Sequence, residues 1–173
     1  MKTYIVLLRG INVGGNNKLP MAELKTRLQD SGFEQIKTYL QSGNVVLKGK
    51  SHPERVVKSL VQDHFGFTPE VCVLTVSEFE TVMQNNPYKG YEGKFVHVYF
   101  CKDTPAVNHD KIQPMALPSE RYAINGKVCY LHAPDGIGRS KLVANIEACL
   151  GVAATGRNLN TVNKLESMVK GVS

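Results

Sequence analysis

The chain has 173 residues, of which 42% are hydrophobic and 21% are charged. A chain of this length buries roughly two thirds of its unfolded surface, so we expect an ordinary core and exclude disorder as its main state. The sequence contains no apolar run of the ~18 residues that a bilayer span requires. We therefore expect a soluble cytoplasmic protein with no membrane partner.

The formal net charge of +6 is concentrated at the two ends of the chain. Residues 1–20 and 136–173 each contribute +3, whereas residues 21–135 balance at zero. The same two segments hold most of the unusual glycine and asparagine content, and this coincidence favours an anionic partner. The alternative is a modest excess of charge that only keeps the protein soluble.

Strand and helix signals alternate in a recognisable order over residues 1–76. The expected elements are a strand at Thr3–Arg9, a helix carrying Met21, Leu24 and Leu28, strands at Gln35–Leu40 and Asn44–Lys48, a helix at His52–Phe65 and a strand at Glu70–Val76. Ser42-Gly43 lies between the middle strands, where a hairpin turn is expected. The order β-α-β-β-α-β is that of a ferredoxin-like unit.

The second half repeats this order less completely. The expected elements are a helix from Ser77, a strand at Lys94–Phe100, a helix at Ala106–Met115, strands at Arg121–Ile124 and Lys127–Leu131, a helix over Leu142–Leu150 and a last helix at Asn158–Lys170. Asn125-Gly126 is a strong signal for a two-residue hairpin. The last helix takes the place of a final strand.

These patterns predict an α+β fold with two ferredoxin-like subdomains of the β-α-β-β-α-β type. Each subdomain has an antiparallel sheet with its helices on one face. The expected boundaries are residues 1–76 and 77–173, and the second subdomain ends in an extra C-terminal helix.

The segment Arg9–Lys18 is the most informative stretch for function. It joins a strand to a helix through about ten residues, which exceeds the usual two to six, and long ordered loops are often functional. Its glycines allow backbone N–H groups to face an anion, near the positive end of the following helix. It is not a Walker loop, because Asn16-Asn17 stand where Lys-Ser/Thr should be. A tight irregular turn without a ligand is the alternative.

Topology predicts that a second segment lies beside this one. In a β-α-β-β unit the exit of the first strand and the hairpin after the second strand share one edge of the sheet. Gln41–Asn44 should therefore neighbour Arg9–Asn12, and together they offer a guanidinium, amides and a hydroxyl for a polar ligand. None of these groups is a strong general base.

Two later segments combine glycines with cations before a helix. They are Pro134–Lys141 and Thr155–Thr161, and each resembles an anion site at a helix start. Ser140 or Asn158 acting only as a helix N-cap explains much of the same composition.

The familiar catalytic patterns are missing. The five histidines show no ligand spacing such as H-E-x-x-H, so we expect no metal site. The four cysteines, Cys72, Cys101, Cys129 and Cys149, lie in apolar stretches, and we expect them to be buried and unpaired. No catalytic residue and no cofactor can be assigned.

Three strings of residues resemble a known family. They are Leu7–Gly15 with Lys18 and Met21, Thr38–Val45, and Thr155–Val162 with Leu165, and they look like the signatures of the bacterial family called domain of unknown function 1697. The resemblance spans the whole chain. It implies an α+β protein with two ferredoxin-like parts and implies no particular activity. Gly156 stands where members often carry another small residue.

We expect the protein to bind a phosphate-bearing ligand, either a nucleotide or a nucleic acid. The candidate ligand-binding residues are Arg9, Asn12, Gly14, Gly15, Lys18, Ser42 and Asn44, joined by Arg157 and Asn158. The alternative is a small-molecule enzyme that uses the same cleft to stabilise a developing negative charge. A third class, a structural or interaction protein, would need an exposed apolar patch.

Overall fold

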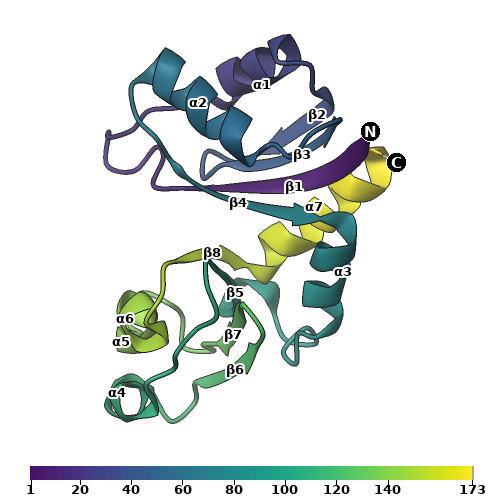
Figure 1. Ribbon diagram of the computed structural model, residues 1–173. Coiled ribbons are helices and arrows are strands. Elements are labelled where there is room, and N and C mark those ends of the chain that lie inside the picture. The colour runs from purple at the N-terminus through teal and green to yellow at the C-terminus, as the bar shows by residue number, and fades with distance from the viewer. Residues whose placement is uncertain (173) are drawn as a thin grey trace. The chain divides into compact units, whose positions relative to one another are not determined.

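The computed structural model describes residues 1–172 (Figure 1). The chain forms two compact units. One comprises Met1–Thr81 together with the C-terminal segment from Lys164, and the other comprises Val82–Asn163.

The first unit is a four-stranded antiparallel sheet with two helices. Its elements are β1 (Lys2–Arg9), α1 (Met21–Asp30), β2 (Glu34–Tyr39), β3 (Asn44–Gly49), α2 (Glu54–Phe65) and β4 (Glu70–Thr75). The strand order is β2-β3-β1-β4, and every neighbouring pair is antiparallel. The expected β-α-β-β-α-β order and the β2–β3 hairpin are confirmed.

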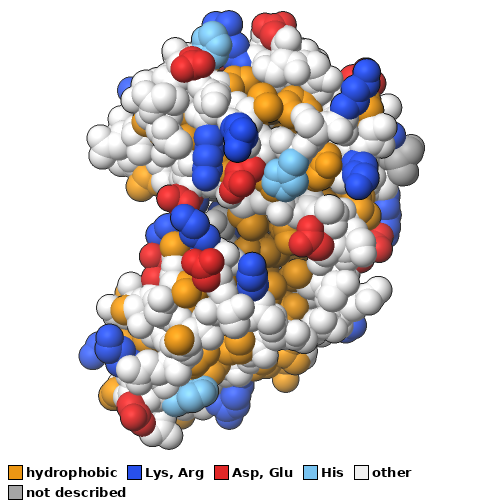
Figure 2. All heavy atoms as spheres, viewed as in Figure 1, with side chains coloured by type: hydrophobic (Ala, Val, Ile, Leu, Met, Phe, Trp, Pro, Cys, Tyr) orange, Lys and Arg blue, Asp and Glu red, His pale blue; other side chains and the backbone are white. Residues whose placement is uncertain are grey.

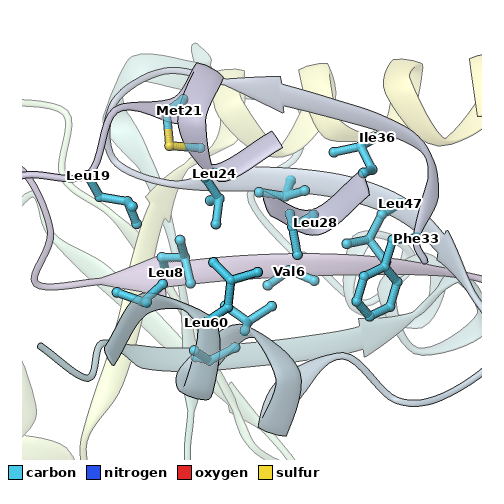
Figure 3. Close-up of a cluster of buried hydrophobic side chains, with 14 of the residues drawn as sticks. Val6, Leu8, Leu19, Met21, Leu24, Leu28, Phe33, Ile36, Leu47 and Leu60 are labelled. Carbon is cyan, nitrogen blue, oxygen red and sulfur yellow. The ribbon is translucent and has the colours of Figure 1, made fainter. Parts of the chain in front are cut away.

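The core of the first unit lies between the sheet and the helices α1 and α2, which cover one face (Figure 1, Figure 3). Alternate residues of β1, including Val6 and Leu8, point toward the helices, and α1 contributes Leu24 and Leu28 at helical spacing. Ile5, on the opposite face of β1, is also fully buried. The strand is therefore buried on both faces, as its nearly continuous apolar sequence predicts.

The second unit repeats the same topology. Its elements are the short 3-10 helix η1 (Gly93–Phe95), β5 (Val96–Cys101), α4 (His109–Met115), β6 (Arg121–Asn125), β7 (Val128–His132), α5 (Lys141–Ala144), α6 (Ile146–Leu150) and β8 (Ala154–Asn158). The strand order is β6-β7-β5-β8, again antiparallel throughout. Two elements are shared between the units along the chain, namely α3 (Val76–Gln84) and α7 (Leu159–Val172).

The strand β8 corrects the sequence analysis, which placed a loop and a helix start there. Gly156 and Asn158 disfavour a strand by their intrinsic propensities, so local pattern could not predict it. Gly156 pairs with Tyr99 of β5, and a Cβ at Gly156 would lie 2.8 Å from the Tyr99 ring. The glycine thus allows the tyrosine ring to lie against β8. The second unit has a complete β-α-β-β-α-β order, and α7 follows its final strand.

The compact units also differ from the expected boundaries of 1–76 and 77–173. The contact boundary lies at Thr81, inside α3, and the part of α7 from Lys164 belongs to the first unit. Within residues 1–172, no helix is long and apolar enough to cross a membrane.

Candidate functional site

The end of β1 and the β2–β3 turn lie side by side, as the topology predicts. The Leu8 N–H donates to the Gly43 carbonyl at 2.8 Å, and the Asn12 side-chain amide donates to the Gln41 carbonyl at 2.8 Å. The two segments that the sequence analysis singled out in the first half therefore form one continuous edge. We call residues 9–19 with residues 40–44 the glycine edge.

Gly43 makes this close approach possible. Its φ is +92°, and a Cβ there would lie 2.6 Å from Leu8 Cβ and 2.8 Å from Ile11 Cδ1. A side chain would therefore both strain the backbone and displace the end of β1. Gly43 has a structural role at the glycine edge.

The loop after β1 is a small hairpin rather than an irregular turn. The Asn12 N–H donates to the Asn17 carbonyl at 3.0 Å, and the Asn16 N–H donates to the Val13 carbonyl at 2.9 Å. Gly14 and Gly15, the two central residues of this turn, have φ of +57° and +78°. Positive φ at both central positions is typical of the tight turns that join twisted strands. Both glycines are exposed, so their backbones lie at the tip of the hairpin.

Asn12 holds this hairpin against the rest of the unit. Its side-chain amide donates to the Leu19 and Gln41 carbonyls, and its Oδ1 accepts from the Leu19 N–H at 2.8 Å. Asn17 adds a bond from its side-chain amide to the Gly10 carbonyl. The polar groups of Asn12 are thus engaged inside the protein, and a ligand would have to share them.

Asn44 has a similar internal role in the neighbouring turn. Its side chain is fully buried, and its amide donates to the Tyr39 carbonyl at 2.8 Å and to Ser42 Oγ at 3.1 Å. Ser42 is exposed beside it. A buried asparagine that satisfies a turn carbonyl stabilises the turn.

The cations of the glycine edge differ in exposure. Lys18 is exposed, whereas Arg9 is half-buried and stands opposite Glu70 in the pairing of β1 with β4. The structure adds Lys164, whose ammonium lies 5.7 Å from the centre of the Tyr39 ring. Sequence reasoning missed Lys164 because 124 residues separate it from Leu40 and no local motif connects them.

Two large apolar side chains are exposed at the same edge. Val13 is 65% exposed and Leu40 is 53% exposed, and Leu40 has a φ of +60°. A positive φ is uncommon for residues other than glycine, asparagine and aspartate, so it is unusual for a leucine. The edge therefore combines an ordered glycine tip with apolar and cationic side chains that face solvent.

Arg157 and Asn158 lie in the second unit, at the end of β8. Arg157 donates to the Gly156 carbonyl at 2.9 Å, and Asn158 Oδ1 accepts from the Thr161 N–H at 2.9 Å. Asn158 is thus the N-cap of α7, and Ser140 likewise caps α5 through the Val143 N–H. Capping therefore gives Asn158 and Ser140 a structural role, and it does not involve the Arg157 side chain.

The cysteines do not form a reactive site among the described residues. None of the four forms a disulfide, and Cys101, Cys129 and Cys149 are buried as expected, but Cys72 is only half-buried. Burial raises the pKa of Cys101 to about 11 and that of Cys129 to about 12. A thiol with a raised pKa is a poor nucleophile at neutral pH.

Histidine and carboxylate groups give no assembled metal site in the described part of the chain. His97 on β5 is buried, and burial lowers its pKa. On the face that Figure 2 shows, Lys and Arg side chains are dispersed among acidic and neutral groups rather than gathered in one patch. An anion site on this face would therefore depend on a few cations at defined positions.

Known proteins resemble this chain in sequence and in fold. The pattern of the family described as "Protein of unknown function (DUF1697)" matches residues 1–130, so the chain belongs to that family. It is similar in structure to the conserved bacterial protein SP0830 from Streptococcus pneumoniae, with a TM-score of 0.71 and 24% identity. That match covers 96% of this chain and 98% of the other, and it shows the fold alone. No curated protein matches this chain.

Proposed function

We propose that the protein binds single-stranded nucleic acid and holds a phosphate of the strand at the glycine edge. The observation that carries this proposal is the ordered glycine tip, Gly14 and Gly15, exposed close in sequence to the exposed Lys18. Exposed backbone N–H groups beside a cation suit a phosphate oxygen. The net charge of +6 supports an anionic partner.

The exposure of the glycine edge favours a strand over a small nucleotide. Small ligands are usually held in concave pockets that cover most of their surface. Here the hairpin tip, Val13 and Leu40 all face solvent. The side-chain amides of Asn12 and Asn44 donate to backbone carbonyls of the protein itself. They are therefore not directed at a substrate, which argues against the enzyme alternative. The proposal includes a cytoplasmic location, where cysteines usually form no disulfide.

The test is a fluorescence anisotropy titration with a labelled ten-nucleotide single-stranded DNA at 50 and 200 mM salt. We expect affinity to fall steeply with salt, as for any binding through phosphates. Lys18→Gln should weaken binding and lower the salt slope by about 1. Arg9→Gln should cost about 1.5–3 kcal/mol if its guanidinium meets the phosphate.

The matched control is Lys102→Gln. Lys102 directly follows β5, in the position of the second unit that corresponds to the glycine loop after β1, and it should be nearly silent. Unchanged binding in Lys18→Gln and Arg9→Gln would place the site elsewhere. If Arg9→Gln unfolds, Arg9 has a structural role opposite Glu70. In that case the binding of Lys18→Gln alone tests whether the glycine edge holds a phosphate. A ligand screen that returns only a small nucleotide, with no binding of the oligonucleotide, would contradict the strand and favour a nucleotide as the ligand.

A further inference from the structure

An ordered turn in the second unit carries two tyrosines. Asn86 is 3% exposed, and its Oδ1 accepts a hydrogen bond from the Tyr88 N–H at 2.9 Å. The Tyr91 N–H donates to the Tyr88 carbonyl at 3.1 Å, which closes the turn. A turn fixed by a buried asparagine positions both rings before any ligand arrives, so less entropy is lost on binding.

The two tyrosines gather around His132, the last residue of β7. The Tyr91 and His132 ring centres lie 4.1 Å apart with 25° between their planes, and the Tyr88 ring lies 6.0 Å from His132 at 27°. Tyr91 is nevertheless 56% exposed. One face of the Tyr91 ring stacks on His132, and with more than half of the residue exposed, ring surface remains accessible to a further ring.

A guanidinium stands beside these rings. Arg121 of β6 pairs with His132 across the sheet, so both side chains lie on the same face. Its Nη1 donates to the Pro118 and Glu120 carbonyls at 2.7 and 2.9 Å, which holds the exposed side chain in place. Burial raises the pKa of Tyr88, and the Arg121 guanidinium is near enough to oppose that rise. An open aromatic face beside a fixed cation complements a planar base attached to a phosphate.

We propose that Tyr91, stacked on His132, binds an unpaired base of a single-stranded nucleic acid, and that Arg121 contacts the adjoining phosphate. Stacking on aromatic side chains is how proteins hold splayed bases, and it tolerates any base. The inference takes its class of ligand from the proposed function. The glycine edge contacts only a phosphate, whereas Tyr91 in the second unit would contact a base.

The probe is a ten-nucleotide single-stranded DNA with one central 2-aminopurine, whose fluorescence is quenched when the base stacks. The parent protein should quench the probe, and Tyr91→Phe should do the same because it keeps the ring. Tyr91→Ala and Tyr91→Leu should lose the quench and bind about tenfold or more weakly. Arg121→Gln should weaken binding and lower the salt slope by about 1. Thermal melting of each variant checks that it is folded.

An oligonucleotide of the same length without bases separates the two proposals. It retains the phosphates, so it should bind through the glycine edge with equal affinity to the parent and to Tyr91→Ala. Absence of quenching by the parent, or equal quenching by the folded Tyr91→Leu, would overturn the stacking site alone. Quenching that survives in a Lys18→Gln, Arg9→Gln double variant with unchanged affinity would overturn the glycine edge alone.

Discussion

The two units share one topology but differ in how their corresponding loops are built. In the first unit, Gly43 brings the β2–β3 turn against the end of β1. In the second unit, a Cβ at Gly126 in the β6–β7 turn would meet no atom within 4 Å. The shared topology therefore fixes where the hairpins lie, and the individual glycine contacts decide how firmly each is held.

The units also differ in their buried polar groups. Asn44 in the first unit is fully buried and donates to two acceptors. In the second unit, and among the described residues, one buried atom without a partner is found on each of Asn86, His97 and Glu120. A buried polar group without a partner costs free energy. In the first unit the buried amide of Asn44 stabilises a turn through its hydrogen bonds. In the second unit three buried polar atoms have no hydrogen-bond partner within the described residues.

The largest expected effect tests the difference between the two turns. Gly43→Ala adds a close contact to a strained φ, so we expect the free energy of unfolding to fall by about 3 kcal/mol. Gly126→Ala, the matched change in the second unit, meets open space and should cost about 1 kcal/mol from its positive φ alone. Urea unfolding of both variants measures the difference. Equal losses would mean that the close approach at Gly43 has no energetic weight.

A smaller effect on the free energy of unfolding is expected at acidic pH and comes from His97, whose buried Nε2 has no hydrogen-bond partner. Burial lowers the pKa of His97 below its usual 6.5, so the unfolded chain binds a proton that the folded chain refuses. The stability from this group is present above pH 6.5 and is lost as the pH falls toward the folded pKa. His97→Phe should remove this part of the pH dependence in urea unfolding at pH 7.5 and 5. His64→Gln, on the exposed surface of α2, should leave it unchanged; the same slope in parent and His97→Phe would contradict the prediction.

The smallest effect concerns reactivity rather than stability. Cys72 of the first unit is half-buried, whereas the three cysteines of the second unit are buried with raised pKa values. At pH 8 a maleimide should therefore modify Cys72 first, and the other three only after denaturant is added. Mass spectrometry identifies the modified residue. Early labelling of Cys129 would show that the second unit opens readily and would make a reactive thiol credible.

The sequence predicted most elements because their apolar periodicity is strong. It failed at β8, because a glycine that is typical of loops can also lie in a strand where a neighbouring side chain needs space. Gly156 and Asn158 looked like a loop, but Gly156 lies in β8 because a neighbouring tyrosine needs the space. Loop length and glycine content indicated the Arg9–Lys18 segment, and topology predicted that Gln41–Asn44 lies beside it. The bonds of Asn12 to Leu19 and Gln41 could not be predicted, because they depend on the folded positions of backbone carbonyls.

The same limit applies to the rings of the second unit. Tyr91 and His132 are 41 residues apart, and nothing in either segment indicates that their rings stack. The contact depends on where the turn that carries Tyr91 lies against the end of β7, which no local sequence pattern gives.

The division of α7 between the units has a consequence for biosynthesis. The first unit begins at Met1 but includes the segment from Lys164, where Leu165 and Met168 are buried. During synthesis the first sheet therefore emerges from the ribosome early. The C-terminal helix that completes its unit emerges more than 80 residues later, after the whole second unit has been made. The nascent chain must hold an unfinished first unit while the second one folds, and loss of the C-terminal turns would harm the part of the protein that was synthesised first.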